Sequence, residues 1–449
     1  MNAVRRRFMP GIHLRYWRFF LGYVIAGGLA VMSVTAIDAP RVSGLVRGQA
    51  WFSPEETAFG ALYGEWNLKL AGETGPVFYQ TDLRVREGLF YDQHETQLEL
   101  KEAYVGYRSG PFETSVGKRV FGWGRVDGYN PTNNLAVYDY FRLSDHPDDQ
   151  KLGVFQWHLN YRIVEGSDLT LVWQPLFTPS VYRYELFDLG APVIFTEPRM
   201  PTYGLAQSNI AFRWNVDYPA VGFSLSYFNG YDPYHGVNLV DVALQPSVQL
   251  TYQPDYYRKQ TVGADLALPL GAFILRAEAA YNFTKGYETK VFVPKPALNA
   301  VLGWETVLAG TTTLVQYQLV WTPDWKALVV PMLTDPYNLE AQYAYAMATA
   351  RYETALFNRR IMKQEKASQH ALMLSLQRNF AYETLSVGFT GQYDLTTEEY
   401  LLRPELVWHC TDALMLKGCA LWMKGPEGSL YGYAGKVLGG VCLGLTVTY

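Results

Sequence analysis

Apolar and polar residues alternate along almost the whole chain, in segments of roughly ten residues. In one such segment Leu62, Trp66 and Leu70 stand at even positions, while Glu65 and Lys69 stand at odd positions. Successive side chains of a β-strand point to opposite faces, so each segment would have one apolar and one polar face. This pattern is typical of transmembrane strands, which face lipid on one side and a lumen on the other. We therefore expect an all-β fold, a transmembrane antiparallel β-barrel.

The composition agrees with a barrel. Aromatic residues make up 15% of the chain and charged residues only 18%, while the mean hydropathy is −0.08. After the first 37 residues no unbroken apolar run is long enough to span a bilayer as a helix. A soluble β-sandwich would also alternate, but its strands are mostly shorter. The formal charge of −4 indicates no particular partner, and no basic cluster suggests binding to nucleic acid.

Both ends of the chain carry features of an exported barrel. Five arginines between positions 5 and 18 precede an uncharged stretch from 19 to 37, and Val34, Thr35 and Ala36 offer small residues for cleavage. This predicts a signal peptide at 1–36 and a single barrel domain at 37–449, the alternative being an uncleaved anchor helix. At the other end an apolar face from Val441 to Tyr449 predicts a closing strand that contacts outer-membrane lipid and the barrel-assembly machinery.

The connections between segments predict the strand number. Because barrels have short periplasmic turns and long outer loops, both termini would be periplasmic and the number even. We expect 18 strands, the first near 45–52, or 16 if that segment is not part of the wall. Tight turns are expected at 109–111, 164–167, 217–219, 269–271, 309–311, 380–382 and 410–412, and long loops at about 122–151, 178–204, 231–257, 284–296, 323–367 and 424–440.

Two local features stand out from the regular pattern. Near Lys101 and Glu102 the alternation slips by one residue, as a β-bulge would cause. Between about 337 and 363, Leu339, Tyr343 and Met347 recur at helical spacing among many alanines. The spacing predicts one short helix in an outer loop, either folded over the mouth as a lid or standing on the rim.

Charged residues on the polar faces would point into the lumen. By parity nine are basic and seven acidic, which predicts at most a mild anion preference; the alternative is that most of them form networks that stiffen the wall. The basic ones are Lys69, Arg84, Arg86, Arg119, Arg162, Arg213, Arg276, Arg403 and Lys417, and the acidic ones are Glu65, Asp82, Glu113, Asp265, Glu278, Glu305 and Glu405. The pore-lining candidates are Arg84, Arg86, Glu113, Arg119, Arg125, Asp127, Arg162, Arg213, Arg276, Glu278, Arg403, Glu405 and Lys417.

One long connection has the residues of a constriction loop. Proline fixes φ and asparagine favours turns, so Asn130 and the proline after it would reverse the chain. The aromatic run that includes Tyr140 and Phe141 would tuck the loop into the lumen, or else pack it on the outer rim. The constriction-loop candidates are Asn130, Asp139, Tyr140 and Phe141. Asp145-His146 and Asp148-Asp149 of the same loop would bind a cation or, as we expect, form a solvated acidic face.

The region from 97 to 151 resembles porin-like outer-membrane barrels of the alginate-export type. That pattern has an acid-bearing strand, a Gly-basic-Gln strand, Trp-Gly, and Asn-Pro followed by Asp. It is matched here by Glu102, Gly117, Trp123, Gly124, Asn130, Pro131 and Asp139, whereas Arg119 stands in place of the glutamine. The resemblance implies a passage for a small solute or a polymer across the outer membrane of a diderm, Gram-negative-type bacterium.

The three cysteines fit neither a disulfide framework nor a metal site. If the last hairpin turns near Tyr431, Cys419 and Cys442 lie opposite each other and face the lumen. They would then form a disulfide or remain two free thiols, and Cys410 has no evident partner.

Three functions are consistent with such a barrel. The first is a passive or substrate-specific channel, as a monomer or trimer. The second is an adhesin or binding protein that acts through long outer loops. The third is a barrel enzyme, which we do not expect because the chain has no Gly-x-Ser-x-Gly or His-Glu-x-x-His motif. No cofactor and no metal site is expected.

Overall fold

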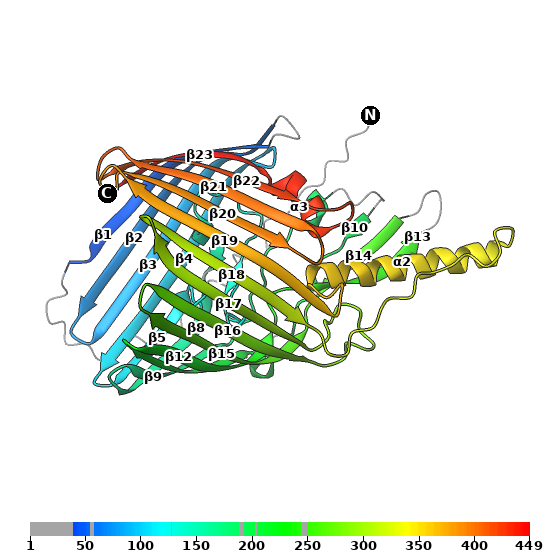
Figure 1. The fold of residues 1–449 in the computed structure, drawn as a ribbon, viewed down its shortest axis with the longest axis horizontal. Helices are drawn as coiled ribbons and strands as arrows, with labels where there is room; N and C mark the ends of the chain where they lie inside the picture. The colour runs from blue at the N-terminus through cyan, green and yellow to red at the C-terminus, as the bar shows by residue number, and fades with distance from the viewer. Residues whose placement is uncertain (1–38, 54–57, 127, 188–192, 203, 244–248) are drawn as a thin grey trace. The chain divides into compact units, whose positions relative to one another are not determined.

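The chain forms a closed antiparallel β-barrel in which each wall strand pairs with its neighbours in sequence (Figure 1). The computed structural model describes residues 39–53, 58–126, 128–187, 193–202, 204–243 and 249–449. The 18 wall strands are β1 (Arg41–Ser53), β2 (Ala58–Thr74), β3 (Val77–Phe90), β4 (Gln93–Ser109), β5 (Phe112–Arg119), β8 (Val154–Val164), β9 (Ser167–Gln174), β11 (Asn209–Tyr218), β12 (Val221–Tyr231), β15 (Arg258–Leu270), β16 (Phe273–Thr284), β17 (Ala297–Leu308), β18 (Thr311–Trp321), β19 (Ser368–Phe380), β20 (Leu385–Asp394), β21 (Glu399–His409), β22 (Leu414–Lys424) and β23 (Gly440–Thr448).

The barrel closes between its first and last strands. β1 pairs with β2 on one side and with β23 on the other. Beyond the end of β23, the backbone N–H groups of Gly44 and Tyr449 each donate to the other residue's carbonyl at 3.1 Å. The segment near 45–52 is therefore part of the wall, and the prediction of 18 strands rather than 16 is confirmed.

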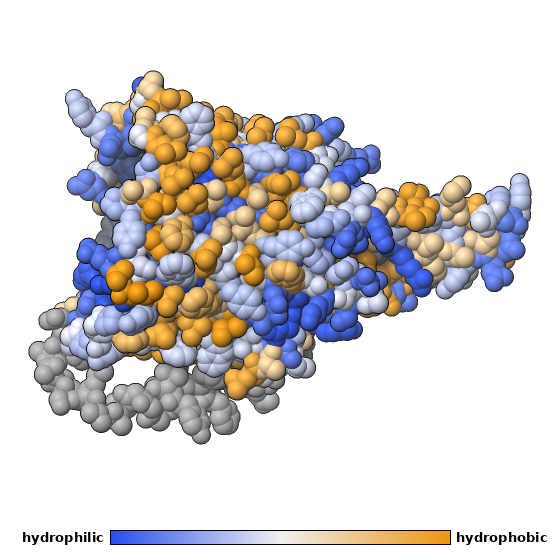
Figure 2. Space-filling view, turned by 60° about the horizontal axis from the view of Figure 1, so that its bottom comes forward, coloured by the Kyte–Doolittle hydropathy of each residue, from blue (hydrophilic) through white to orange (hydrophobic). Residues whose placement is uncertain are grey.

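The outer face of the wall is apolar, as the alternation predicted. Figure 2 shows apolar side chains gathered over the strands. Eight strand tryptophans share the outward parity of Trp66. Seven of them are exposed and Trp173 is partly exposed; the seven are Trp66, Trp157, Trp214, Trp304, Trp321, Trp408 and Trp422. Trp51 breaks this pattern because its ring points inward, where it packs in a buried cluster with Leu143 of a loop and the two facing cysteines.

The predicted bulge lies in β4. Asp82 of β3 faces Glu102, but the next residue, Leu83, faces Leu100, so Lys101 is the extra residue. The carbonyl of Lys101 approaches Gly153 so closely that a Cβ there would lie 1.9 Å from the oxygen, which explains the need for glycine. Because of the bulge, Glu99 on one side of it and Glu102 on the other both face the lumen.

The two ends of the barrel differ. All connections at the end that holds the C-terminus are short, and glycines with positive φ, such as Gly110 and Gly271, form several of the turns. At the other end six connections are long, while those between β1 and β2, β3 and β4, and β20 and β21 are short. None of the helices in the described ranges is both long and apolar enough to cross a membrane. The predicted signal peptide, 1–36, lies outside the described residues.

The long connections carry additional elements. A three-stranded sheet of order β10-β14-β13 stands among them, and β6 pairs with β7. The remaining elements are β6 (Val137–Tyr138), η1 (Pro147–Gln150), β7 (Lys151–Leu152), η2 (Tyr184–Leu186), β10 (Val193–Phe195), η3 (Leu205–Gln207), β13 (Gly236–Ala243), β14 (Gln249–Asp255), α2 (Leu339–Ile361) and α3 (Leu430–Leu438).

The predicted outer helix is α2, which spans Leu339–Ile361 and so lies within the predicted region 337–363. Its N-cap Asn338 accepts bonds from two backbone N–H groups, and its C-terminal half packs on the small sheet through Phe357 and Asn358. Figure 1 shows α2 running beside β13 and β14 and away from the barrel, so the helix stands on the rim and is no lid. A second helix, α3, was not predicted; it begins at the N-cap Ser429 and packs against β22.

Candidate functional site: the barrel lumen

The connection between β5 and β8, residues 120–153, lies inside the barrel. Trp123 and Leu135 of this inner loop pack on Val172, Ala211 and Phe228, which are inward-facing residues of β9, β11 and β12. All five side chains are buried. The loop therefore takes the first of the two positions considered from the sequence, within the lumen. Its role as a constriction remains a prediction.

The Trp-Gly and Asn-Pro residues shape the start of the inner loop. The Asn130 amide donates to the carbonyl of Trp123, and its Oδ1 accepts from the N–H of Asn133 at 3.1 Å. Gly124 has φ of +106°, and a Cβ there would lie 1.9 Å from the Asn130 amide. A side chain at position 124 would thus break the turn, which gives this motif a physical role.

Arg47 of β1 holds the far part of the inner loop against the wall. Its guanidinium donates to Asp145 at 2.6 Å, to Asp149 at 2.7 Å and to Glu65 of β2 at 3.1 Å. Arg84 of β3 donates to the other oxygen of Asp149 at 2.6 Å. All five side chains are more than 90% buried, so this is a desolvated cluster in which every charge has a partner.

The cluster belongs to a larger network that is electrically balanced. Its members are the cations Arg47, Lys69, Arg84, Arg86, Lys101 and Arg142 and the acids Glu65, Asp82, Glu99, Asp139, Asp145 and Asp149, six of each. The expectation of a solvated acidic face was therefore wrong for Asp145 and Asp149, because this part of the loop folds inside. Among the described residues no acidic or histidine cluster is arranged to hold a metal ion.

Asp149 is charged despite its burial. Burial alone would raise the pKa of this carboxyl group, but Arg47, Arg84 and the Ser144 hydroxyl outweigh that influence. The pKa of Asp149 is therefore held well below its usual range. The loop carries its negative charge at neutral and mildly acidic pH.

Glu278 of β16 forms a second anchor for the inner loop. Its carboxylate accepts from the backbone N–H and the hydroxyl of Thr132, at 2.7 and 2.8 Å, and from the N–H of Arg125 at 3.3 Å. The Arg125 guanidinium donates to Asp265 of β15 at 2.8 Å, and its carbonyl accepts from Arg276 at 3.0 Å. Nearby ion pairs are Arg125–Asp217, Arg213–Asp265 and Arg276–Glu305.

Three arginines among the pore-lining candidates have no carboxylate within ion-pair distance in the described part of the chain: Arg119, Arg162 and Arg403. Arg119 donates to the Ser115 hydroxyl at 3.0 Å and lies over the ring of Tyr104. Arg162 is exposed near the turn end, and Arg403 donates to the carbonyl of Asp145 at 2.9 Å. These are the lumen cations whose charge is least compensated.

The remaining wall candidates form simple pairs. Lys417 of β22 lies 3.4 Å from Glu405 of β21, and Glu113 accepts from Arg108 at 2.8 Å. Asp127 lies outside the described residues.

The aromatic candidates connect the inner loop to the outer loops. The ring of Tyr140 stacks on Tyr182 with centroids 5.3 Å apart, and Phe141 lies 5.6 Å from Phe187. The Asp139 carboxylate accepts from the N–H of Phe141 at 3.1 Å and thereby fixes the turn. These residues join neighbouring loops at the outer side of the lumen.

Several residues of the network were not among the candidates: Arg47, Glu99, Lys101, Arg142, Asp145 and Asp149. Arg47 shares the inward parity of Gln49, so the alternation of β1 contained a signal for it. The two aspartates bond to residues about a hundred positions away, and no local pattern indicates such partners.

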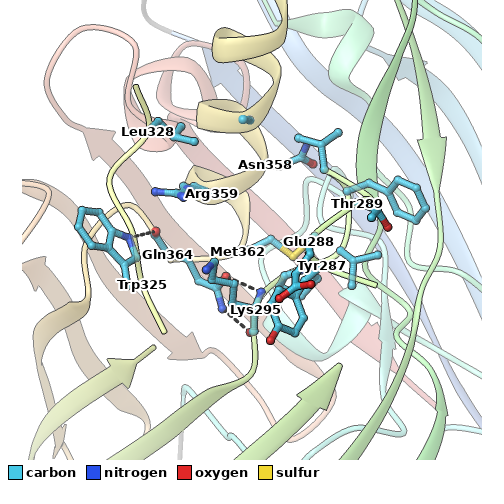
Figure 3. A pocket seen from close by; sticks show the side chains of 15 residues that line it. Tyr287, Glu288, Thr289, Lys295, Trp325, Leu328, Asn358, Arg359, Met362 and Gln364 are labelled. Atoms are coloured by element: carbon cyan, nitrogen blue, oxygen red, sulfur yellow. Dashed lines mark hydrogen bonds between the residues drawn. The ribbon is translucent and has the colours of Figure 1, made fainter. Parts of the chain in front are cut away.

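A separate cavity of about 250 Å³ lies among the outer loops (Figure 3). It is lined by the β16–β17 connection, by residues near Trp325 and by the end of α2. Arg359 lies over the Trp325 ring at 5.5 Å, and Gln364 exchanges two hydrogen bonds with the backbone of Lys295. These bonds tie the end of α2 to the neighbouring loop.

Comparisons with known proteins reveal similarity of fold. No protein-family model and no curated protein sequence matches this chain. Among solved structures, Pseudomonas aeruginosa OpdK with vanillate superposes with a TM-score of 0.52 at 10% identity, covering 92% of this chain and 99% of that one. OccK5 (OpdH) gives 0.51 at 12%, covering 92% and 98%, and OccK2 (OpdF) with glucuronate gives 0.50 at 12%, covering 92% and 98%, both from the same organism.

OpdK is described as an outer membrane protein of this organism. At such low identity the similarity establishes the shared fold. The prediction of an 18-stranded antiparallel β-barrel of the transmembrane type is thus confirmed in its fold, whereas the finer resemblance to the alginate-export type is not supported by these comparisons.

Proposed function

We propose that the protein is a passive channel for small solutes across the outer membrane. The observation that carries this proposal is the inner loop, which the closed 18-stranded wall anchors on opposite sides of its lumen. A barrel of this size encloses more space than side chains of the wall alone fill, so a loop within it can set the width of an aqueous passage.

The uncompensated arginines support a mild preference for anions. The network around Asp149 has no net charge, so selectivity would come from Arg119, Arg162 and Arg403. OpdK and OccK2, which have a similar fold, were solved with vanillate and glucuronate, respectively. We propose small carboxylates as the solutes to test first.

Single-channel recording of the refolded mature chain in a planar bilayer tests the proposal. With a salt gradient we expect steady, ohmic openings and a small reversal potential whose sign indicates anion selectivity. The absence of openings from a heat-modifiable, folded barrel would overturn the proposal that the protein is a channel. Openings with a cation-selective reversal potential would overturn only the anion preference.

A second candidate function is binding at the cell surface, and the extension on the rim favours it. The connection to α2 and the first turn of α2 carry four apolar residues that are each more than 75% exposed: Val329, Met332, Tyr337 and Leu339. Deletion of 329–349 separates the two functions. A channel should retain its conductance, whereas a binding protein should lose attachment to its partner.

We also propose the finer features expected from the sequence. The closing strand that ends at Tyr449 would be recognised by the barrel-assembly machinery, and the barrel would work as a monomer or a trimer. The alginate-export resemblance adds a polymer as a solute to be tested beside small carboxylates. We propose no enzymatic activity.

A further inference from the structure

Two of the three cysteines lie directly opposite each other in the last hairpin. Cys419 of β22 and Cys442 of β23 are register partners in the antiparallel ladder. Directly opposed residues have Cα atoms about 4.5–5.5 Å apart, which lies within the range that a disulfide spans. The third cysteine, Cys410, follows β21, and the residue of β21 that faces Cys419 is Glu405, five positions away.

The surroundings hold the two thiols on the same side of the wall. Cys419 is 5% exposed and Cys442 is fully buried, and both belong to the inward-facing cluster with Trp51 and Leu143. The amide of Gln49 donates to the Cys442 sulfur at 3.2 Å. Both are thiols in this structure. No shift of the register is needed to bring the two sulfurs together.

We propose that Cys419 and Cys442 form a disulfide in the mature protein. An outer-membrane barrel crosses the periplasm, where disulfides form and persist. The thiolate of one cysteine attacks the disulfide of a periplasmic thiol–disulfide oxidoreductase and forms a mixed disulfide. The second thiolate then displaces the oxidoreductase, which leaves as a dithiol, so the two electrons and two protons lost by the cysteines reduce the oxidant.

The burial of the pair indicates when the bond forms. Because Cys442 has no exposed surface in the folded barrel, the oxidoreductase must act before the last hairpin joins the wall. The bond closes a ring from 419 to 442 that contains α3. It therefore links the two strands beside the seam between β1 and β23. This inference does not depend on whether the barrel conducts.

Thiol counting tests the proposal. Folded, heat-modifiable protein is isolated from outer membranes without reductant, denatured in a maleimide reagent and weighed by mass spectrometry. We expect one label before reduction, on Cys410, and three after it. Trypsin should release the peptide 418–424 linked to 437–449. Three labels before reduction, or a linked peptide containing Cys410, would overturn the proposal.

Two serine variants serve as matched controls. Cys410→Ser should take no label before reduction and two after it, whereas Cys442→Ser should take two labels in both conditions. Two labels on unreduced Cys410→Ser would overturn the proposal. Since each count is made on protein already inserted as a folded barrel, poor folding of one variant does not affect the result for the other.

Discussion

The anchor at Arg47 allows a test of how the inner loop is held. In the variant Arg47→Met the side chain keeps its approximate length but loses its charge. Asp149 would retain Arg84 at 2.6 Å, whereas Asp145 would retain only the Ser144 hydroxyl, at 3.5 Å. Since Asp145 is 1% exposed, the variant leaves a buried carboxylate without a cation.

The expected effect on loop docking is large. Removing one partner of a buried ion pair costs about 3–5 kcal/mol. The wall is held by its own ladders, so this cost falls mainly on the docked state of the loop, which can leave the wall to rehydrate Asp145. A loss of about 3 kcal/mol shifts the docking equilibrium by more than about a hundredfold.

Single-channel recording and limited proteolysis measure the shift. Arg47→Met should show larger, noisier openings than the unmodified protein, together with faster tryptic cleavage at Arg142. Adding Asp145→Asn to this variant should restore part of the docking because it removes the stranded charge. The control is Arg108→Met, which breaks an exposed pair worth about 0–1 kcal/mol. The reasoning is refuted if Arg47→Met and Arg108→Met behave alike in both assays.

Three further predictions concern pH, selectivity and the rim. Because the pKa of Asp149 is lowered in the folded protein, its contribution to loop docking is complete above the ordinary aspartate pKa and is lost as the pH falls from there toward the lowered pKa. The conductance should therefore stay constant from pH 7 to about 4, and an increase in conductance near pH 6 would contradict this prediction. Arg119→Glu should move the reversal potential toward cation selectivity, whereas Lys326→Glu in an outer loop should not. Asn358→Ala leaves two backbone groups of β13 unpaired, at about 1–3 kcal/mol each, so protease should cleave α2 faster than in Gln342→Ala.

Much of the wall could be predicted because its side chains obey one simple period. Each strand faces lipid on one side, so the outward tryptophans and the slip at Lys101 were visible as alternation and a break in it. The helix near 337–363 was recognisable because its spacing differs from that of the strands.

The rest depends on contacts that no local pattern contains. The partners of Asp145 and Asp149 come from β1 and β3, between 65 and 102 residues away in the sequence. β10 is only three residues long and pairs in parallel with β14. Glycines at 432 and 435 hid α3, although the N-cap Ser429 was a signal for it.

The bulge in β4 has a consequence for how this barrel tolerates changes in length. Elsewhere in a strand, losing one residue reverses the facing of every side chain on one side of the deletion, which would turn charges toward lipid. Deleting Lys101 would instead restore plain alternation, with Glu99 and Glu102 still on the lumen side. The side-chain interactions lost would be the bond from its ammonium group to the carbonyl of Asp148 and the ion pair with Asp149 at 3.9 Å. A deletion within β4 should therefore be tolerated best at this single position.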